Sequence, residues 1–164
     1  MFTGIIEKTG MIEEVLSNGN NRSFRVSSPL YNELKVDQSL SHDGVCLTIE
    51  NLQNGQHQVT AIAETLAKTN LGTWQKGTII NLERCMQLNG RLDGHFVQGH
   101  VDTTAECMDI VNRNGSWEYR FRFPEKFANL IIEKGSITVN GISLTLFNIS
   151  NTAFGSLLLQ KLPI

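Results

Sequence analysis

The sequence has no long hydrophobic run and no recognisable export signal. Its longest apolar run near the carboxyl end is Leu157-Leu158-Leu159, whereas a membrane-spanning helix needs about 20 apolar residues. The amino terminus, which begins Met1-Phe2-Thr3-Gly4, lacks the basic and apolar regions of a secretory signal peptide. We therefore expect neither a membrane partner nor export from the cell.

Positive charge and paired cysteines are also scarce. The 164 residues include 14 Lys and Arg against 16 Asp and Glu, and because nucleic-acid binding requires clustered positive charge, we expect no nucleic-acid partner. The three cysteines, Cys46, Cys85 and Cys107, form no CxxC motif, which argues against a disulfide framework and a zinc site. Reduced thiols are typical of the cytoplasm, which is the predicted location.

A regular succession of turn signals and short β-rich runs fills the chain instead. Asn-Gly and Asp-Gly pairs, which favour hairpin turns, begin at positions 18, 43, 54, 89, 114 and 140. The runs between them include Val45–Ile49, Thr78–Leu82 and Tyr119–Phe123. Short helices are expected at Pro29–Leu34, Glu64–Leu71 and Pro124–Ile132. This pattern predicts an all-β barrel or sandwich.

The chain contains two copies of one β-rich module. Residues 39–48 (SLSHDGVCLT) match residues 136–145 (SITVNGISLT), and residues 4–6 match residues 99–101. Each copy is long enough to close a small barrel, so we predict one domain at 1–88 and a second at 89–164. The copies differ where Cys46 corresponds to Ser143 and Ile5 to His100, which indicates two similar pockets with unequal roles.

Several blocks, in the same order along the chain, resemble the riboflavin synthases and the related lumazine proteins. These blocks are Met1–Glu7, Gly44–Thr48, Glu64–Leu66, Thr69–Gly72, Gly94–Asp102 and Gly141–Thr145. The resemblance implies two tandem six-stranded Greek-key β-barrels. It also implies a transferase, riboflavin synthase, which makes riboflavin and 5-amino-6-(ribitylamino)uracil from two molecules of 6,7-dimethyl-8-ribityllumazine. In this family no metal or organic cofactor is needed, and a C-terminal helix gathers three subunits, so that each site lies between neighbours.

Three residues are the predicted catalytic set. Cys46 follows an Asp-Gly turn and is expected beside the bound lumazine, as a nucleophile or a hydrogen-bond partner, although a cysteine between Val45 and Leu47 is also a typical small core residue. His100 is the candidate acid or base, since histidine titrates near neutral pH; the alternative is a structural, hydrogen-bonded histidine. Ser143 supplies a hydroxyl in the second copy.

Eight further residues are expected to bind the ring edges and the ribityl chain. They are Phe2, Ser39, Thr48, Ala63, Glu64, Thr65, Lys134 and Thr145. Cys85 and Cys107 match no site position and are interpreted as structural. His95 and His100 fall on opposite faces of a strand, so no metal site is predicted. His42 and His57 lie in turn-like segments and are expected to face solvent.

The carboxyl end departs from the family pattern. The first copy runs from about Phe2 to Arg84, and a second copy of equal length starting at Val97 would extend past residue 164. Counterparts of 64–66, 69–72 and 78–83 are therefore expected to be missing, and residues 155–164 show no resemblance. An incomplete second barrel exposes unpaired strand edges. The alternative function is a non-catalytic lumazine- or flavin-binding protein of the same superfamily.

Overall fold

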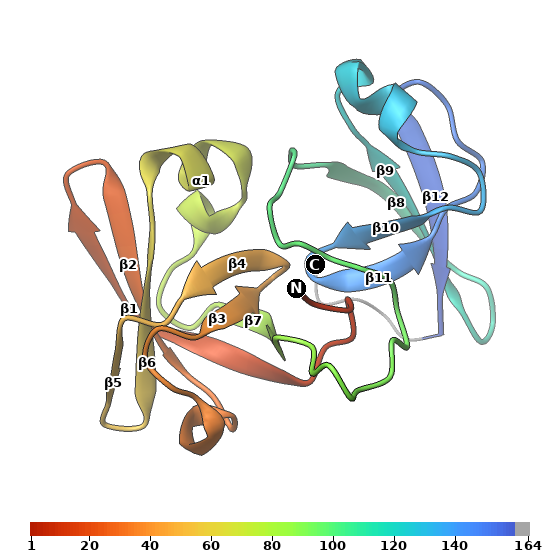
Figure 1. Ribbon diagram of the computed structural model, residues 1–164. Coiled ribbons are helices and arrows are strands. Elements are labelled where there is room, and N and C mark those ends of the chain that lie inside the picture. The colour runs from red at the N-terminus through yellow and green to blue at the C-terminus, as the bar shows by residue number, and fades with distance from the viewer. Residues whose placement is uncertain (160–164) are drawn as a thin grey trace. The chain divides into compact units, whose positions relative to one another are not determined.

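The computed structural model describes residues 1–159, which form two compact units (Figure 1). Unit 1 contains Met1–Asp102 together with Thr138–Ile142, and unit 2 contains Thr103–Ile137 and the chain from Ser143 onward. Residues 89–102 and the turn at 138–142, assigned from the sequence to the second domain, thus pack with unit 1. The reason is local: Val97 pairs with Phe2 in a β-bridge, and Val101 packs against the unit 1 core.

Unit 1 consists of seven strands and three short helices. The strands are β1 (Lys8–Asn18), β2 (Asn21–Ser27), β3 (Ser39–His42), β4 (Val45–Thr48), β5 (Asn51–Gln53), β6 (Gln56–Ala61) and β7 (Ile79–Arg84). The helices are η1 (Tyr31–Glu33), α1 (Ala63–Lys68) and η2 (Leu71–Thr73), which fall on two of the predicted helical segments. Across residues 1–159, no helix is long and apolar enough to cross a membrane.

The sheet of unit 1 closes through one bent segment, residues 45–53. The strand order is β4-β3-β7-β1-β2-β6-β5, so the two ends of the sheet are β4 and β5. Only Ile49 and Glu50 separate β4 from β5, and the Glu50 N–H donates to the Gln58 carbonyl of β6 at 2.9 Å. Counted as one strand, 45–53 gives a closed six-stranded barrel in which β7 returns beside β3. This is the Greek-key connection, and the predicted fold is confirmed.

The interior of this barrel is apolar. Alternate residues of the strands, including Ile12, Phe24, Leu40, Val59 and Leu82, are fully buried, as the two-residue period of a strand requires. Trp74 packs in this core, with its ring edge-on to Phe24 at 5.1 Å between centroids. Burial of these side chains is the main stabilising term of the barrel.

Unit 2 repeats the strand pattern of unit 1 as far as the structure describes it. The second module has the strands β8 (Glu106–Asn112), β9 (Trp117–Arg122), β10 (Ser136–Val139), β11 (Ile142–Thr145) and β12 (Ala153–Leu158) and the helix η3 (Glu125–Leu130). All of these belong to unit 2 except residues 138–142 of the β10–β11 hairpin, which pack with unit 1. The sheet β12-β9-β8 corresponds to β6-β2-β1, and the hairpin β10-β11 to β3-β4. The counterparts of α1 and β7 would follow β12, from residue 160 onward, and these positions lie outside the described residues.

The repeat extends to an irregularity in the strand pairing. In β1 the register with β2 shifts between Ile12 and Glu14, and in β8 the register with β9 shifts between Cys107 and Asp109, at the corresponding positions. A β-bulge increases the local twist and bends its strand. The two units therefore share the bend as well as the strand order, which confirms the internal duplication.

Two histidines lie in the core of unit 1, which corrects the expectation that they face solvent. His42 and His57 are both 0% exposed, and their Nε2 atoms are 2.9 Å apart in a hydrogen bond. The His42 Nδ1 atom also bonds to the Leu40 carbonyl at 3.0 Å. Burial lowers the pKa of His42 to about 3 and that of His57 to about 4. Each lies on a strand, with its side chain on the inner face, which the turn signals nearby do not reveal.

We predict that this pair makes unit 1 sensitive to acid. The unfolded chain binds protons at these histidines near pH 6.5, whereas the folded chain binds them only near pH 3 to 4. The stabilisation is therefore complete above pH 6.5 and is lost as the pH falls toward 4. Between pH 6.5 and 4.5, the free energy of unfolding should fall by about 4 kcal/mol more in the wild type than in a His42→Gln/His57→Gln variant, about 2 kcal/mol for each histidine, measured by urea denaturation.

Asp43 also makes the stability of unit 1 depend on pH, which is why the wild type is compared with the double histidine variant. Burial raises its pKa to about 7 from 3.8, so its contribution is present at low pH and is lost as the pH rises through 7, opposite to the histidines. Because Asp43 is present in both proteins, the difference between them isolates the histidine pair. Identical pH dependence in the two proteins would contradict the prediction.

Candidate functional site

Polar side chains occupy the outer face of β3 and β4. Register pairs Ser39 with Thr48 and Ser41 with Cys46, and residues directly opposite in an antiparallel ladder share a face. Val45 and Leu47 belong to the buried core on the other face. Cys46 is therefore not one of the core residues of the barrel, and it lies with three hydroxyl groups on the outside.

The turn between β3 and β4 determines which way the backbone of Cys46 points. Asp43 and Gly44 have φ of 47° and 84°, the two positive values of a type I′ turn. Along the hairpin, pairs that are hydrogen-bonded to each other alternate with pairs that are not, beginning with the hydrogen-bonded pair next to the turn. Ser41 and Cys46 form the second pair, so their backbone N–H and C=O groups point away from the hairpin. The Cys46 N–H accordingly donates to the Gly99 carbonyl at 2.9 Å.

Two segments of unit 1, residues 1–4 and 95–100, cover this face. Phe2 is fully buried and exchanges backbone hydrogen bonds with Val97, at 2.7 and 3.0 Å. Gly99 has φ of 80°, and a Cβ atom there would lie 2.7 Å from Cys46 Cβ and 3.0 Å from Phe2 Cε2. The absence of a side chain at Gly99 is thus what allows Phe2, Gly99 and Cys46 to pack together.

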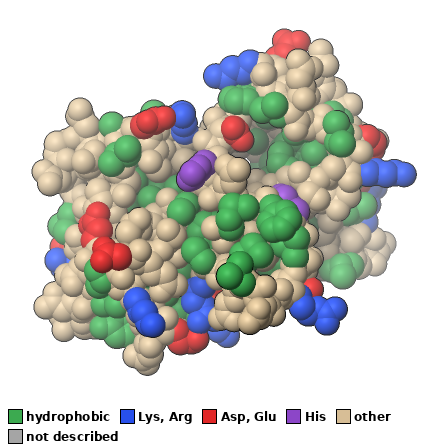
Figure 2. All heavy atoms as spheres, in the orientation of Figure 1, with side chains coloured by type: hydrophobic (Ala, Val, Ile, Leu, Met, Phe, Trp, Pro, Cys, Tyr) green, Lys and Arg blue, Asp and Glu red, His purple; other side chains and the backbone are tan. Residues whose placement is uncertain are grey.

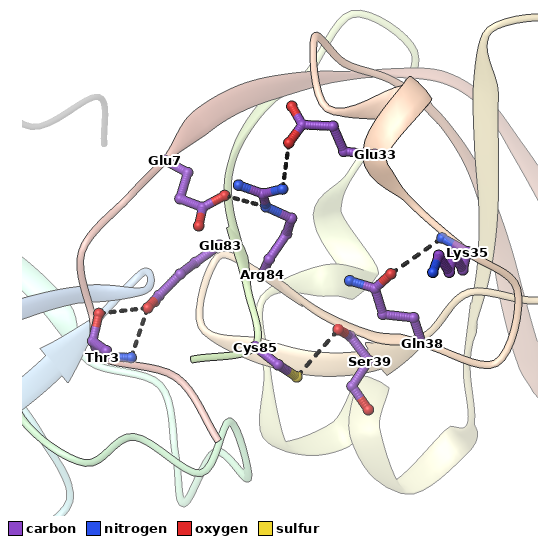
Figure 3. Close-up of polar contacts among 9 residues, drawn as sticks. All are labelled: Thr3, Glu7, Glu33, Lys35, Gln38, Ser39, Glu83, Arg84 and Cys85. Atoms are coloured by element: carbon purple, nitrogen blue, oxygen red, sulfur yellow. Dashed lines mark hydrogen bonds and ion pairs between the residues drawn. The ribbon is translucent and has the colours of Figure 1, made fainter. Parts of the chain in front are cut away.

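A buried carboxylate lies on the same outer face. Glu83 of β7 pairs in register with Ser41 and is 3% exposed. Its Oε1 atom accepts hydrogen bonds from the Thr3 N–H and the Thr3 hydroxyl, both at 2.6 Å (Figure 3). Its Oε2 atom accepts from the Gly4 N–H at 3.0 Å. The next residue, Arg84, bonds instead to Glu7 and Glu33 (Figure 3).

His100 follows Gly99 directly and is exposed. In the same segment, the His95 N–H donates to the Thr3 carbonyl at 3.0 Å, and its Nε2 atom bonds to the Thr138 hydroxyl at 3.2 Å. Partial burial lowers the pKa of His95, and the negative charge of Glu83 opposes that shift. Figure 2 shows hydrophobic side chains gathered where Figure 1 marks the N-terminus, and the exposed residues Met1, Ile5 and Phe96 belong to or directly follow these segments.

Ala63, Glu64 and Thr65 form the first turn of α1 in unit 1, and their polar contacts are local. Glu64 pairs with Lys68 at 2.8 Å, and this hydrogen bond and charge lower the pKa of the Glu64 carboxyl. The Thr65 carbonyl accepts from the Thr69 hydroxyl. Their backbone and side chains thus remain exposed or half-buried at the end of β6.

Three of the predicted site residues belong to unit 2. Ser143 and Thr145 lie on β11 at the positions that correspond to Cys46 and Thr48. The Asn140-Gly141 turn before them has φ of 46° and 81°, matching the first hairpin. Lys134 is exposed and has φ of 62°, and its N–H donates to the Leu146 carbonyl at 2.9 Å. Among residues 1–159, no three or more His, Cys, Asp or Glu side chains are grouped to hold a metal ion.

Comparison with known proteins identifies the family. The model of the lumazine binding domain matches residues 3–85 and again 98–161. Riboflavin synthase of Bacillus subtilis (strain 168) is 38% identical over 151 residues, covering 92% of this chain and 70% of that protein. Riboflavin synthase of Mycobacterium bovis is 43% identical over 152 residues, covering 88% and 73%. The chain belongs to the riboflavin synthase family.

Membership in the riboflavin synthase family confirms the predicted enzyme class, a transferase. Solved structures of LumP share the fold: the complex with riboflavin superposes with a TM-score of 0.89 at 18% identity, over 96% of this chain and 86% of LumP. The family match runs to residue 161, which corrects the expectation that residues 155–161 lack resemblance. Residues 160–164 lie outside the described part of the structure.

Two residues of the covered face, Gly99 and Glu83, are not among the residues predicted for the site. The alternation Ile80-Asn81-Leu82-Glu83 is a usable signal, because it puts Glu83 on the outer face of its strand. Its burial depends on Thr3 and Gly4, which are about 80 residues away in sequence, and local pattern carries no such information.

We predict that a side chain at position 99 destabilises unit 1. Gly99→Ala would force a Cβ atom against Cys46 and Phe2 in a backbone conformation that L-residues rarely adopt, which should cost about 1–3 kcal/mol of unfolding free energy, measured by urea denaturation. Gly72→Ala is the control, because its φ is ordinary and nothing lies within 4 Å of the added Cβ. Equal stability of the two variants would contradict the prediction.

Proposed function

We propose that this protein is a riboflavin synthase that dismutates two molecules of 6,7-dimethyl-8-ribityllumazine. One molecule donates a four-carbon unit and leaves as 5-amino-6-(ribitylamino)uracil, and the other accepts it and becomes riboflavin. The two products together contain the atoms of the two substrates, so the overall step is redox-neutral and balances without an external oxidant. The observation that carries the proposal is the free thiol of Cys46 on a polar outer face, beside the buried Phe2 ring, in a chain of this family.

The proposed chemistry requires a nucleophile, a proton carrier and groups that stabilise developing charge. Cys46 acts as the nucleophile or hydrogen-bond partner at the ring of one lumazine. His100 transfers the methyl proton, and its exposed position after Gly99 leaves its ring accessible to a ligand. Ser143, which replaces Cys46 in the second copy, donates a hydrogen bond to the second lumazine.

The remaining predicted residues bind the substrate. Phe2, Ser39, Thr48, Ala63, Glu64 and Thr65 serve the lumazine of the first module, and Lys134 and Thr145 serve that of the second. The hydroxyls of Ser39 and Thr48 face the same side as Cys46, as contact with one planar ligand requires. Holding two such rings face to face converts an encounter of two molecules into a positioned reaction. In a homotrimer formed through a C-terminal helix, each such pair of modules comes from two neighbouring subunits.

A second candidate function is binding of lumazine or flavin without turnover. The fold is shared with LumP, which is solved in complex with riboflavin and with 6,7-dimethyl-8-(1'-D-ribityl) lumazine. A binding protein needs a pocket but no acid or base, so His100 would be dispensable for its ligand affinity. The 38% identity with the Bacillus subtilis riboflavin synthase, against 18% with LumP, favours the enzyme.

We predict that the purified protein converts 6,7-dimethyl-8-ribityllumazine into riboflavin, followed by absorbance. Cys46→Ser should lower kcat at least tenfold, and His100→Gln should lower it by about 100-fold, the usual contribution of general acid–base catalysis. Cys107→Ser is the matched control, because Cys107 lies on β8, where its thiol bonds to the Asp109 carbonyl of the same strand, and it should leave kcat unchanged.

The outcomes separate the two candidate functions. Lumazine binding without riboflavin formation, unaffected by His100→Gln, would support the binding protein. No binding of lumazine or riboflavin at all would reject both candidates.

A further inference from the structure

We propose that Glu83 is a positioning residue for the proposed lumazine pocket. Its buried carboxylate holds residues 1–4 against the barrel, and through Thr3 it also holds residues 95–100, so that Phe2 and His100 are kept in place beside Cys46. This inference rests on the proposed function for the identity of the ligand. The positioning itself rests on contacts within unit 1.

The carboxylate of Glu83 receives its hydrogen bonds from the amino-terminal segment. All three bonds described above come from Thr3 and Gly4, and all three partners are donors. An ionised carboxylate only accepts, so it matches this set, and burying it without such partners would be very costly. The neighbouring cation, Arg84, points to the opposite face and bonds to Glu7 and Glu33 (Figure 3). The Glu83 carboxylate is therefore hydrogen-bonded only when Thr3 and Gly4 are in place, and these two residues are held in place by the carboxylate.

Thr3 links Glu83 to both covering segments. Its N–H and hydroxyl bond to Glu83, and its carbonyl accepts from the His95 N–H at 3.0 Å. The residue before it, Phe2, pairs with Val97 and lies against Gly99. The Gly99 carbonyl in turn accepts from the Cys46 N–H. A series of direct contacts thus connects the Glu83 carboxylate with the backbone that carries Phe2, Cys46 and His100.

The barrel itself does not depend on these contacts. Its first strand begins at Lys8, and its sheet closes through residues 45–53. Loss of the Glu83 contacts should therefore loosen residues 1–4 and 95–100 while the barrel remains folded. Local opening of this kind exposes covered groups without global unfolding, and Cys46 is the covered group that can report it.

The test uses Glu83→Gln, in which the amide –NH₂ faces the Gly4 N–H as a second donor, and Thr3→Val, which removes the hydroxyl. Thr3→Ser keeps the hydroxyl and should behave as the wild type. Glu33→Gln is the control, because it removes a carboxylate that bonds to Arg84 at the surface. Alkylation of Cys46 by iodoacetamide is followed by peptide mass spectrometry with Cys107 in unit 2 as reference. Binding of 6,7-dimethyl-8-ribityllumazine is followed by its fluorescence.

We expect Glu83→Gln to raise the alkylation rate of Cys46 and the Kd for the lumazine by roughly tenfold, the effect of losing a charge-assisted hydrogen bond. Thr3→Val should shift both in the same direction, while the Cys107 rate and the thermal unfolding midpoint stay close to wild type. Unchanged Cys46 alkylation and unchanged Kd in Glu83→Gln would overturn the proposal.

Two further outcomes are decisive. If Glu83→Gln unfolds and Thr3→Val leaves Cys46 alkylation at the wild-type rate, Glu83 is only structural and the proposal fails. If the wild type does not bind the lumazine but Glu83→Gln selectively exposes Cys46, the positioning stands and the proposed function fails.

Discussion

The geometry of the candidate site depends on the way in which the first barrel closes. One bent segment, residues 45–53, pairs with β3 at its start and with β6 at its end. The sheet therefore has no free edge except along β4, which pairs with β3 on one side only. The type I′ turn before it determines which residue pairs of β3 and β4 are hydrogen-bonded to each other. Cys46 falls in a non-hydrogen-bonded pair, so its N–H points to that unpaired edge. Gly99 occupies the edge with its carbonyl. Barrel closure and the placement of Cys46 on the outer face of the barrel are consequences of the same strand.

The duplicated module explains why similar hairpins carry different chemistry. Both copies have positive φ at the two turn residues, and both have a register shift at the corresponding place in their first strand. The turns even meet: a Cβ atom on Gly44 would lie 2.7 Å from the Gly141 nitrogen. Because the two hairpins share this backbone, side chains on the outer face can differ between them without a change in the turn. Cys46 in one hairpin and Ser143 in the other are such a difference.

Local pattern predicted the strands, the short helices and the duplication, because these depend on turn chemistry and on the two-residue period. The alternation Val45-Cys46-Leu47-Thr48 is enough to put Cys46 and Thr48 on one face. Pattern could not predict the burial of His42 and His57, since both are polar residues beside turn signals and their mutual hydrogen bond joins different strands. Nor could it predict the burial of Glu83, whose partners lie about 80 residues away. What was missed is in each case a polar group whose environment is made by distant parts of the chain.

A polar face covered by its own amino terminus has a physical advantage for binding a planar, polar ligand. A preformed barrel alone would leave the Cys46 face open to water, where hydrogen bonds and charges have little net effect. The cover excludes water from Phe2 and Glu83, and the hydrogen bonds of Glu83 stabilise a segment that has no strand of its own to hold it. Because the cover and the Cys46 face are joined through backbone groups of Phe2, Thr3 and Gly99, the residue type is restricted at each of these positions. Phe2 must fill space, Thr3 must donate, and Gly99 must have no side chain.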